Sequence, residues 1–409
     1  MTRDVLLAID AGGSYVKATT FDLTTSESHT VGEPVGLSRS APGFNERDAD
    51  GLWRATVRCV QGCLQRLDGG AGRVAAVGIT GHGNGVYLVD DRGMPSRSAI
   101  MASDGRAASL VRGWVAEGVE DRLRPAAWNG LWAGKPGPIL AWLAAHEPDT
   151  LAASHAVLGC KDYLRARLTG EVHTELSDAS AGGLYDNSAL ISRPDAVLHP
   201  ATATLDELGL GAHAHLLLPA IDPMTTFAVS GEAALETGLT AGTVVVAGVV
   251  DNAAMQHGSG IFDSSAICVG AGTWSINQLL VPLTDMTMDG ALGAVLPSAA
   301  NAALGGYGLL CEASATSASS FAWALETAVT GESSADRSAG RDIFAAALKR
   351  EGSRPRRPDD PMFFPYIDGS REEAAARGAW LGLSSAATEG DLLGAVLEGI
   401  CLEHRRHVD

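Results

Sequence analysis

The chain has 409 residues, of which 46% are hydrophobic and 19% are charged. This composition can bury a sizeable core, which argues against intrinsic disorder and allows two large α/β domains. Its 30 Lys and Arg against 48 Asp and Glu give a net charge of −18. That balance argues against a nucleic-acid-binding protein, because such proteins need clustered cations. A small phosphorylated ligand stays compatible, since it needs only a local positive potential.

The N-terminus and the cysteines indicate the cellular compartment. Met1-Thr2-Arg3-Asp4 leads directly into the apolar residues 5–9 and has no signal-peptide layout. No apolar run reaches the roughly 18 residues that a membrane-spanning helix needs. The six cysteines include no Cys-x-x-Cys pair, and a chain this long does not depend on a disulfide scaffold. We therefore expect a soluble cytoplasmic protein with no membrane partner.

In chain order, the sequence predicts strands and helices that alternate. Residues 4–10 form a buried strand, residues 11–14 a glycine turn and residues 15–23 a second strand, which together make a hairpin. The apolar spacing over 48–67 predicts a helix. Further expected elements are a strand at 73–80, a glycine-broken loop at 81–85, a strand at 86–89, helices at 138–146 and 161–168, and at 242–250 an apolar strand buried on both faces.

The opening pattern recurs after residue 250. Residues 266–270 predict a strand, 271–273 a small-residue tip and 274–280 a second strand, so each half of the chain opens with a similar hairpin. This indicates an internal duplication, with domains at 1–246 and 247–409. The polar, basic stretch 331–360 is expected to be a surface excursion or a lid. The last helix is expected to begin near Thr388, with Asp391 completing a capping box.

The first hairpin carries residue types that suit a phosphate and a metal ion. The N–H groups of Gly12, Gly13 and Ser14 could point at phosphate oxygens, because glycine leaves no side chain in the way. Asp10 could hold Mg²⁺, and Lys17 could add a positive charge. An ordinary β-turn with a surface lysine is the alternative. Gly272 and Thr273 form the matching tip in the second half and would meet the same nucleotide.

Asp251 follows the apolar run 242–250 directly. Sites in α/β sheets form where strands end, and a carboxylate there could accept a hydroxyl proton during phosphoryl transfer. Asp is also a favoured N-cap residue, so a purely structural role at the start of a helix is the open alternative.

Polar side chains in two other segments suit a polyhydroxylated ligand. The loop Gly81-His82-Gly83-Asn84-Gly85 places two hydrogen-bonding side chains among three glycines, and Asp104-Gly105-Arg106 is a second polar cluster. A sugar has a hydroxyl on nearly every carbon and needs several such groups. No Walker A motif occurs, which excludes a P-loop kinase.

Together these segments resemble the FGGY carbohydrate kinase family, the sugar-kinase branch of the actin-like ATPases. The similarity runs over nearly the whole chain in the family's order. The most specific match comes near the end, where the spacing of the family's C-terminal signature is kept. The matching segments are residues 6–14 with Lys17, 103–107, 161–164, 168–170, 177–180, 248–252, Gly272-Thr273, 312–314, and Gly378, Trp380, Gly382-Leu383, Asp391-Leu392 and 395–398.

The resemblance implies a fold and a mechanism. The fold would be α/β, with two actin-like (ribonuclease H-like) ATPase lobes, an interdomain cleft and a shortened second lobe. ATP and Mg²⁺ would be the cofactors, Asp251 would take the proton from a sugar hydroxyl, and Asp10 and Asp251 would hold the metal. The glycine tips would hold the phosphates. The sugar-binding residues implied are His82, Gly83, Asn84, Asp104, Trp132, Asp251 and Asn252.

The glycine-rich loop and the segment 128–136 look most like those of kinases of L-xylulose or 3-keto-L-gulonate. The expected substrate is therefore a ketopentose, xylulose or L-xylulose in type. A kinase of another polyol such as erythritol or glycerol, and a non-catalytic sugar-binding relative, are the alternatives. Family members are often dimers, so the resemblance allows a homodimer, although no interface is legible from the sequence.

The length bears on the resemblance. A kinase of this family continues past the helix of Glu398 into a glycine-rich segment that holds adenosine, whereas only eleven residues follow Glu398. The sequence therefore predicts that part of the adenine pocket is missing and that ATP affinity is weak or absent.

Overall fold

The computed structural model describes residues 3–192, 197–272, 275–285, 307–314, 316–325, 355–367 and 376–408. The chain divides into two compact units. The first consists of residues 1–264 and 280–310, and the second of residues 265–279 and 311–409. The expected excursion at 331–360 lies outside the described residues up to position 354.

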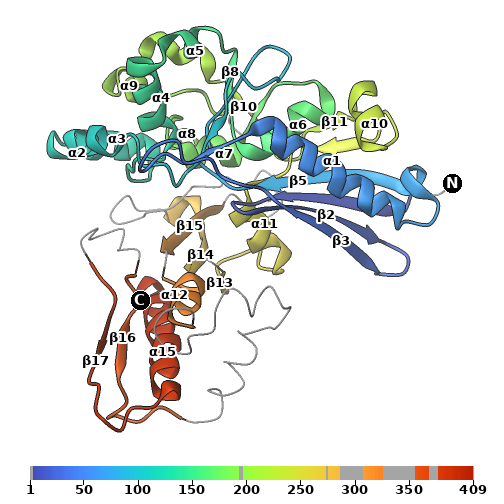
Figure 1. Ribbon diagram of the computed structural model, residues 1–409. Coiled ribbons are helices and arrows are strands. Elements are labelled where there is room, and N and C mark those ends of the chain that lie inside the picture. The colour runs from blue at the N-terminus through green and yellow to red at the C-terminus, as the bar shows by residue number, and fades with distance from the viewer. Residues whose placement is uncertain are drawn as a thin grey trace. The chain divides into compact units, whose positions relative to one another are not determined.

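A six-stranded sheet with the order β11-β12-β5-β1-β2-β3 forms the centre of the first unit (Figure 1). β1 pairs antiparallel with β2 and parallel with β5, and β5 pairs parallel with β12. The strands of this sheet are β1 (Val5–Ala11), β2 (Tyr15–Asp22), β3 (Ser28–Pro34), β5 (Val74–Gly81), β11 (Thr226–Ala228) and β12 (Val244–Val246).

Short two-stranded ladders and helices complete the first unit. The ladders pair β4 (Glu46–Arg47) with β7 (Ala99–Ile100), β6 (Tyr87–Val89) with β8 (Ala156–Leu158), and β9 (Thr174–Glu175) with β10 (Ala220–Ile221). The α-helices are α1 (Ala49–Gln65), α2 (Ala108–Ala116), α3 (Val119–Ala127), α4 (Pro136–His146), α5 (Pro148–Ala152), α6 (Cys160–Thr169), α7 (Leu176–Gly182), α8 (Ala189–Ser192), α9 (Thr202–Glu207), α10 (Gly231–Thr237) and α11 (Asp251–Gly258). The 3₁₀ helices are η1 (Gly70–Arg73), η2 (Gly211–Leu216) and η3 (Leu283–Asp285).

The second unit has its own small elements and its own core. β13, β14 and β15 pair in that order, and β16 pairs antiparallel with β17. α15 carries the buried residues Leu393 and Val396, which pack with Phe363 of β16. The elements that lie wholly or partly here are β13 (Ile267–Ala271), β14 (Ser275–Pro282), β15 (Tyr307–Ser314), α12 (Ala318–Trp323), β16 (Met362–Phe364), β17 (Ala379–Leu381) and α15 (Glu389–Val408).

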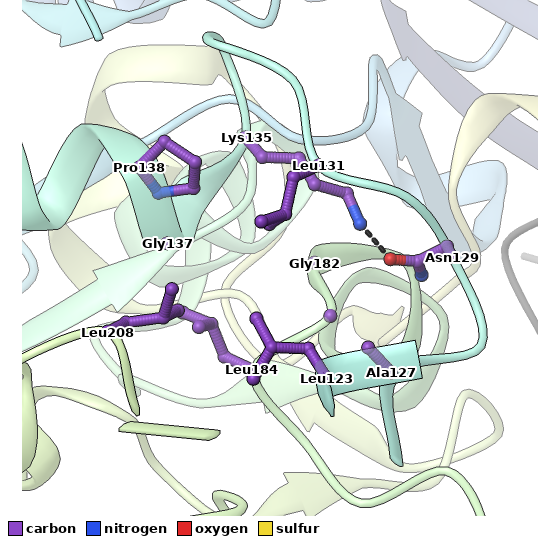
Figure 2. A pocket seen from close by; sticks show the side chains of 11 residues that line it. Leu123, Ala127, Asn129, Leu131, Lys135, Gly137, Pro138, Gly182, Leu184 and Leu208 are labelled. Carbon is purple, nitrogen blue, oxygen red and sulfur yellow. Dashed lines mark hydrogen bonds between the residues drawn. The ribbon is translucent and has the colours of Figure 1, made fainter. Parts of the chain in front are cut away.

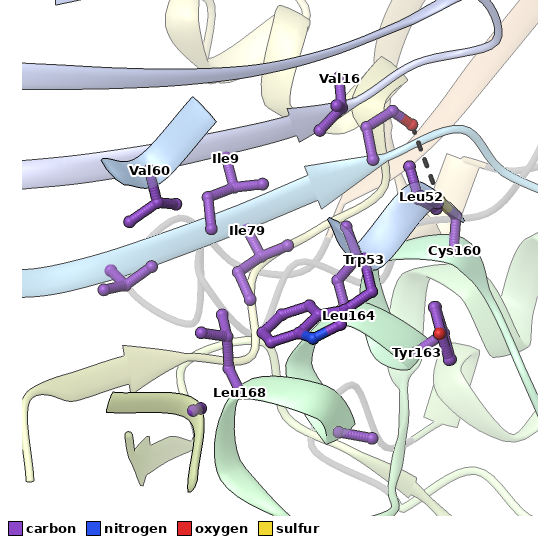
Figure 3. Packing of buried hydrophobic residues seen from close by; sticks show 14 of the residues in the cluster. Ile9, Val16, Leu52, Trp53, Val60, Ile79, Cys160, Tyr163, Leu164 and Leu168 are labelled. Atoms are coloured by element: carbon purple, nitrogen blue, oxygen red, sulfur yellow. Dashed lines mark hydrogen bonds between the residues drawn. The ribbon is translucent and has the colours of Figure 1, made fainter. Parts of the chain in front are cut away.

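One core of the first unit lies between the sheet and the helices α1 and α6 (Figure 3), and a second cluster packs around α3 and α4. Ile9 and Ile79 of the strands meet Trp53 and Val60 of α1 and Leu164 of α6. Burying each such side chain stabilises the fold by about 1.5–3 kcal/mol relative to leaving it exposed. This packing fixes the ends of β1 and β5, where the candidate site lies.

Most of the expected elements are confirmed. Both glycine hairpins form, since β1 pairs with β2 and β13 with β14. The expected capping box is also confirmed, because Thr388 Oγ1 accepts from the Asp391 N–H at 3.2 Å and the Asp391 carboxylate accepts from the Thr388 N–H at 2.8 Å. The segments expected to be helical at 48–67, 138–146 and 161–168 correspond to α1, α4 and α6.

Two strand predictions need correction. The first strand is buried on one face only, because Val5, Leu7 and Ile9 point into the core while Leu6 is 40% exposed. The segment 242–250 forms only the three-residue strand β12, of which Val245 is buried and Val244 is 37% exposed. An apolar sequence shows that a segment avoids water but does not show how much of it pairs with a neighbouring strand.

The division between the units falls later than the boundary expected after residue 246. α11 belongs to the first unit because its start is attached to that unit's sheet. Thr80 of β5 donates its hydroxyl hydrogen to the Val249 carbonyl at 2.7 Å, and Val250 and Ala253 are buried beside Leu280 and Leu309.

Candidate active site

Asp10 lies near the carboxyl end of β1, beside the glycine tip that leads into β2. It is opposite Lys17 across the hairpin and opposite Thr80 on the parallel strand β5. Burial raises the pKa of the Asp10 carboxyl, and the nearby Lys17 ammonium opposes that shift. Asp10 is therefore a partly buried carboxyl group at the edge where parallel strands end, where α/β folds usually bind ligands.

The tip at residues 12–14 offers fewer N–H donors than expected. The Gly12 N–H closes the hairpin by donating to the Tyr15 carbonyl at 2.9 Å, so it is not available for a phosphate. Within the described chain, the N–H groups of Gly13 and Ser14 have no hydrogen-bond partner, and both residues are exposed. The expected cradle of three donors is thus corrected to two.

Asp251 is the first residue of α11, which begins soon after β12. Val250 is the N-cap, since its carbonyl accepts from the Ala254 N–H, so an N-cap role for Asp251 is wrong. The Asp251 carboxylate accepts from the N–H of Asn252 at 2.8 Å. Burial, followed by the negative charge of Asp10, raises the pKa of Asp251 to about 7, against the effect of the Asn252 hydrogen bond.

Strand order explains why Asp10 and Asp251 are close. β12, β5 and β1 are adjacent parallel strands, and parallel strands present their carboxyl ends at the same sheet edge. Asp10 is the penultimate residue of β1, and Asp251 follows β12. The two carboxyl groups are close enough for the charge of one to raise the pKa of the other. Carboxylate oxygens are ligands that Mg²⁺ prefers, so the pair fits this ion.

The glycine-rich loop at 81–85 lies next to Asp251. A side-chain carbon at Gly83 would lie 3.0 Å from Val250 Cγ2, a tight contact that would require Val250 to shift by a few tenths of an ångström. Asn84 adopts a left-handed backbone with φ of 59°, and its Oδ1 is buried with no hydrogen-bond partner among the described residues. An orphaned acceptor of this kind can receive a hydrogen bond from a ligand hydroxyl.

His82 of this loop is engaged within the protein. Its N–H donates to the Ala11 carbonyl, and its Nε2 is hydrogen-bonded to the Tyr87 hydroxyl at 3.1 Å. Burial, aided by the positive charge of Arg47, lowers the pKa of His82 to about 3, so the imidazole is neutral near pH 7. His82 therefore serves to hold the loop against β1 and β6.

A buried ionic cluster supports the segment that carries Asp251. The Lys161 Nζ lies 2.9 Å from Asp162, 2.8 Å from Glu175 and 3.0 Å from Asp178. Burial lowers the pKa of Lys161, but these three carboxylates outweigh it and raise the pKa. Ser177 donates its hydroxyl hydrogen to Glu175 at 2.5 Å and accepts from the Val250 N–H at 2.9 Å. The cluster is thus connected to the N-cap of α11.

Asp104 and Trp132 lie in other surroundings. The Asp104 carboxylate is buried and accepts from the Asn45 N–H at 2.6 Å and from Arg106 Nε at 2.8 Å, so both of its oxygens are already bonded within the protein. The Lys135 Nζ lies 4.7 Å from the centre of the Trp132 ring. The expected sugar-binding roles of Asp104 and Trp132 stay predictions.

A small pocket beside Lys135 contains none of the expected site residues (Figure 2). Lys135 points at Asn129 and is hydrogen-bonded to the Asn129 Oδ1. Its other walls come from apolar and glycine residues, including Leu123, Leu131 and Gly182.

The matching tip of the second half is described only in part. Gly272 follows β13 and accepts a hydrogen bond from the Ala318 N–H at 3.0 Å, while Thr273 lies outside the described residues. Within the described ranges, no three His, Cys, Asp or Glu side chains gather as a metal site. No helix in the described part of the chain is long and apolar enough to cross a membrane.

Comparison with known proteins identifies the class of protein that has this site. The model of the N-terminal domain of the FGGY family of carbohydrate kinases matches residues 5–258. L-xylulose/3-keto-L-gulonate kinase of Escherichia coli (strain K12) is 31% identical over 405 residues, which are 98% of this chain and 76% of the relative. Erythritol kinase of Brucella abortus (strain 2308) is 28% identical over 414 residues, and the match covers 98% of this chain and 76% of the relative.

Structural similarity agrees with the sequence comparison. The crystal structure of xylulose kinase from Rhodospirillum rubrum matches with a TM-score of 0.82 at 24% identity, covering 99% of this chain and 78% of that one. This likeness confirms the predicted α/β, actin-like fold class. The chain belongs to the FGGY family of carbohydrate kinases. It is accordingly a sugar kinase.

Some residues of the site did not emerge from the sequence. Arg47, Tyr87 and Glu175 carried no expected role, although Arg47 and Tyr87 are bonded to the elements of the site and Glu175 is bonded to Ser177. Charged residues within the helical stretch 161–169 were the available signal, since a buried helix that carries Lys, Asp and Arg needs partners for them. Arg47 gave no such signal, because it lies in a polar segment where an exposed arginine would be ordinary.

Proposed function

We propose that this kinase transfers the γ-phosphoryl group of ATP to a hydroxyl of a ketopentose, of the xylulose or L-xylulose/3-keto-L-gulonate type. The observation that carries the proposal is Asp251, a carboxyl group with a pKa raised to about 7 beside the glycine-rich loop. A general base works best when its pKa lies near the operating pH.

Each residue of the site then has a role in the transfer. Asp251 accepts the proton of the attacking hydroxyl, and Asn84 accepts a hydrogen bond from another hydroxyl of the sugar. Gly13 and Ser14 donate their N–H groups to phosphate oxygens, and Lys17 adds positive charge. Asp10 would hold Mg²⁺, with Asp251 as the second carboxylate that faces the ion. This ion neutralises charge on the phosphates when bound. Gly272 and Thr273 stay proposed contacts of the nucleotide.

The choice of sugar rests on the relatives. The relative at 31% identity is an L-xylulose/3-keto-L-gulonate kinase, whereas the erythritol kinase is 28% identical, so ketopentoses rank before tetritols. The second candidate is erythritol or a related polyol. The erythritol kinase relative supports this second candidate, and the orphaned Asn84 acceptor suits a polyol as well as a ketopentose.

A coupled assay of ADP release with a panel of sugars tests this proposal. The panel holds D-xylulose, L-xylulose, 3-keto-L-gulonate, erythritol and glycerol, and the highest kcat/KM is expected for a pentulose or for 3-keto-L-gulonate. Asp251→Asn keeps the size of the side chain and removes the base, so kcat should fall by about 10²–10⁴. Turnover of none of these compounds, together with measurable sugar binding, would favour a non-catalytic sugar-binding relative.

A further inference from the structure

Arg47 is a buried arginine that contacts the glycine tip. It lies in β4 and is 1% exposed. Its guanidinium donates from Nη1 to the Gly12 carbonyl at 3.1 Å and from Nη2 to the Gly13 carbonyl. Its positive charge opposes the burial that raises the pKa of the Tyr87 hydroxyl. The side chain therefore connects β4 to the tip between β1 and β2.

The charge of Arg47 is not balanced within the described residues. No carboxylate lies within ion-pair distance of it there, and its Nε is buried without a hydrogen-bond partner in the same ranges. Other buried arginines of the unit have such partners, since Arg165 lies 2.5 Å from Asp162 and Arg106 lies 2.8 Å from Asp104. A buried cation without a counter-charge is costly, and an anionic ligand nearby would relieve that cost.

The contacts of Arg47 also set the direction of the tip's donors. In a trans peptide the C=O and the following N–H point in opposite directions. Because Arg47 binds the carbonyls of Gly12 and Gly13, the N–H groups of Gly13 and Ser14 point away from it. These are the two donors that have no partner within the described chain.

We propose that Arg47 is a positioning residue for the phosphate site. It holds the two peptide planes of the tip so that the Gly13 and Ser14 donors face the bound phosphates, and its positive charge strengthens their attraction for an anion. The inference rests on the proposed function, in which this tip binds the phosphates of ATP. It goes further by assigning the orientation of the tip to one side chain outside the hairpin.

No hydrogen bond between described residues joins Arg47 to the glycine-rich loop at 81–85. His82 of this loop is bonded to Tyr87, whose hydroxyl lies 3.1 Å from the His82 Nε2. His82 is also held by its own N–H bond to the Ala11 carbonyl, which does not involve Arg47. A change at Arg47 should therefore affect phosphate binding more than sugar binding.

Binding of Mg²⁺-tripolyphosphate, followed by calorimetry, tests the inference without any contribution from adenosine. Arg47→Lys keeps the charge but cannot bridge two carbonyls, and Arg47→Gln removes the charge. We expect the Kd for tripolyphosphate to rise about tenfold in the first variant and more in the second. In the kinase assay, the KM for ATP should rise together with the Kd for tripolyphosphate, while the KM for the sugar stays within about twofold of the wild-type value.

Arg73→Lys is the matched control, because Arg73 bridges Asp4 and Asp22 at the opposite end of the same hairpin. It should leave the Kd for tripolyphosphate within about twofold. If circular dichroism shows that one Arg47 variant does not fold, the Kd of the other variant for tripolyphosphate tests the inference. An unchanged Kd together with a lower Tm or kcat would show a merely structural arginine and overturn the inference.

The wild-type chain separates this inference from the proposed function. If it binds tripolyphosphate but phosphorylates no sugar, the proposed function fails and the comparison of Kd values still tests Arg47. If it does not bind tripolyphosphate, the tip is not a phosphate site and the inference fails.

Discussion

Asp251 has surroundings that oppose its ionisation. It is largely buried at the first residue of α11, and the carboxylate of Asp10 adds negative charge nearby. A single hydrogen bond from the Asn252 N–H acts in the opposite direction. The resulting pKa of about 7 leaves an appreciable fraction of each protonation state at neutral pH, which suits a group that accepts and releases a proton in each cycle.

Because the base must be ionised to accept a proton, activity should increase with pH. We expect kcat/KM for the sugar to rise as the pH passes through about 7 and to level off at higher pH. The Asp178 carboxyl, whose pKa burial also raises to about 7, is a second group able to give such a profile. Asp178→Asn is therefore the matched control.

The rise near pH 7 should persist in Asp178→Asn. A pH profile that becomes flat in this variant would assign the titration to Asp178 instead. A wild-type profile that is flat between pH 5.5 and 8.5, about 1.5 units on either side of pH 7, would argue against a base of this pKa. His82 is not expected to contribute, because its pKa of about 3 lies below this range.

At the scale of single residues, position along the chain was the informative signal. Asp10 and Asp251 were predicted because each follows an apolar strand, and the structure brings both to one sheet edge. Asp104 shows the limit of this reasoning, since its partners Asn45 and Arg106 bond both of its oxygens. Arg47 shows the opposite limit, because a buried charge cannot be told from an exposed one by sequence alone.

At the scale of elements, the two glycines around β12 set the path from the sheet to Asp251. Gly242 has φ of +81° and precedes the strand, and Gly248 has φ of +74° and follows it. A side-chain carbon at Gly242 would meet no atom within 4 Å, whereas one at Gly248 would lie 2.0 Å from the Ile79 carbonyl oxygen. The two positions have the same backbone requirement and differ in the space around them.

This difference predicts unequal effects of alanine. Gly242→Ala should lower the free energy of unfolding by about 1–2 kcal/mol, the cost of a left-handed backbone. Gly248→Ala adds a clash with β5, so the loss should be about 2–5 kcal/mol. It should also displace the segment that leads to Asp251 and lower kcat at least about 100-fold. Urea unfolding and the coupled kinase assay measure the two effects.

Equal losses of stability and activity in the two glycine variants would contradict this account of β12. The comparison also shows what sequence reasoning could reach for this element. The apolar run 242–250 predicted a strand in the right place, but the two left-handed glycines limit pairing to Val244–Val246. The β1–β2 hairpin was predicted more closely, because its glycine tip marks the point at which the two strands turn back on each other.

At the scale of the whole molecule, each unit has its own hydrophobic core. Leu7 is buried in the core of the first unit and Leu393 in that of the second. All of the proposed sugar-binding residues lie between positions 1 and 264 and therefore belong to the first unit. The duplication of the glycine hairpin indicated two parts from sequence alone. It could not indicate that residues 280–310 return to the first unit, because that depends on contacts distant in sequence.

Two units with separate cores predict two thermal transitions, which calorimetry can resolve. Leu7→Ala and Leu393→Ala remove matched buried side chains and should each destabilise their own unit by about 2–5 kcal/mol. A sugar that binds the first unit should stabilise only that unit, by about 2.7 kcal/mol at 100 times its Kd. The transition lowered by Leu7→Ala should therefore be the one that the sugar raises, while the transition lowered by Leu393→Ala stays in place. The contrary result is a single transition that both substitutions lower and the sugar raises. It would mean that the two units unfold together, so that the binding free energy of the sugar stabilises the whole chain.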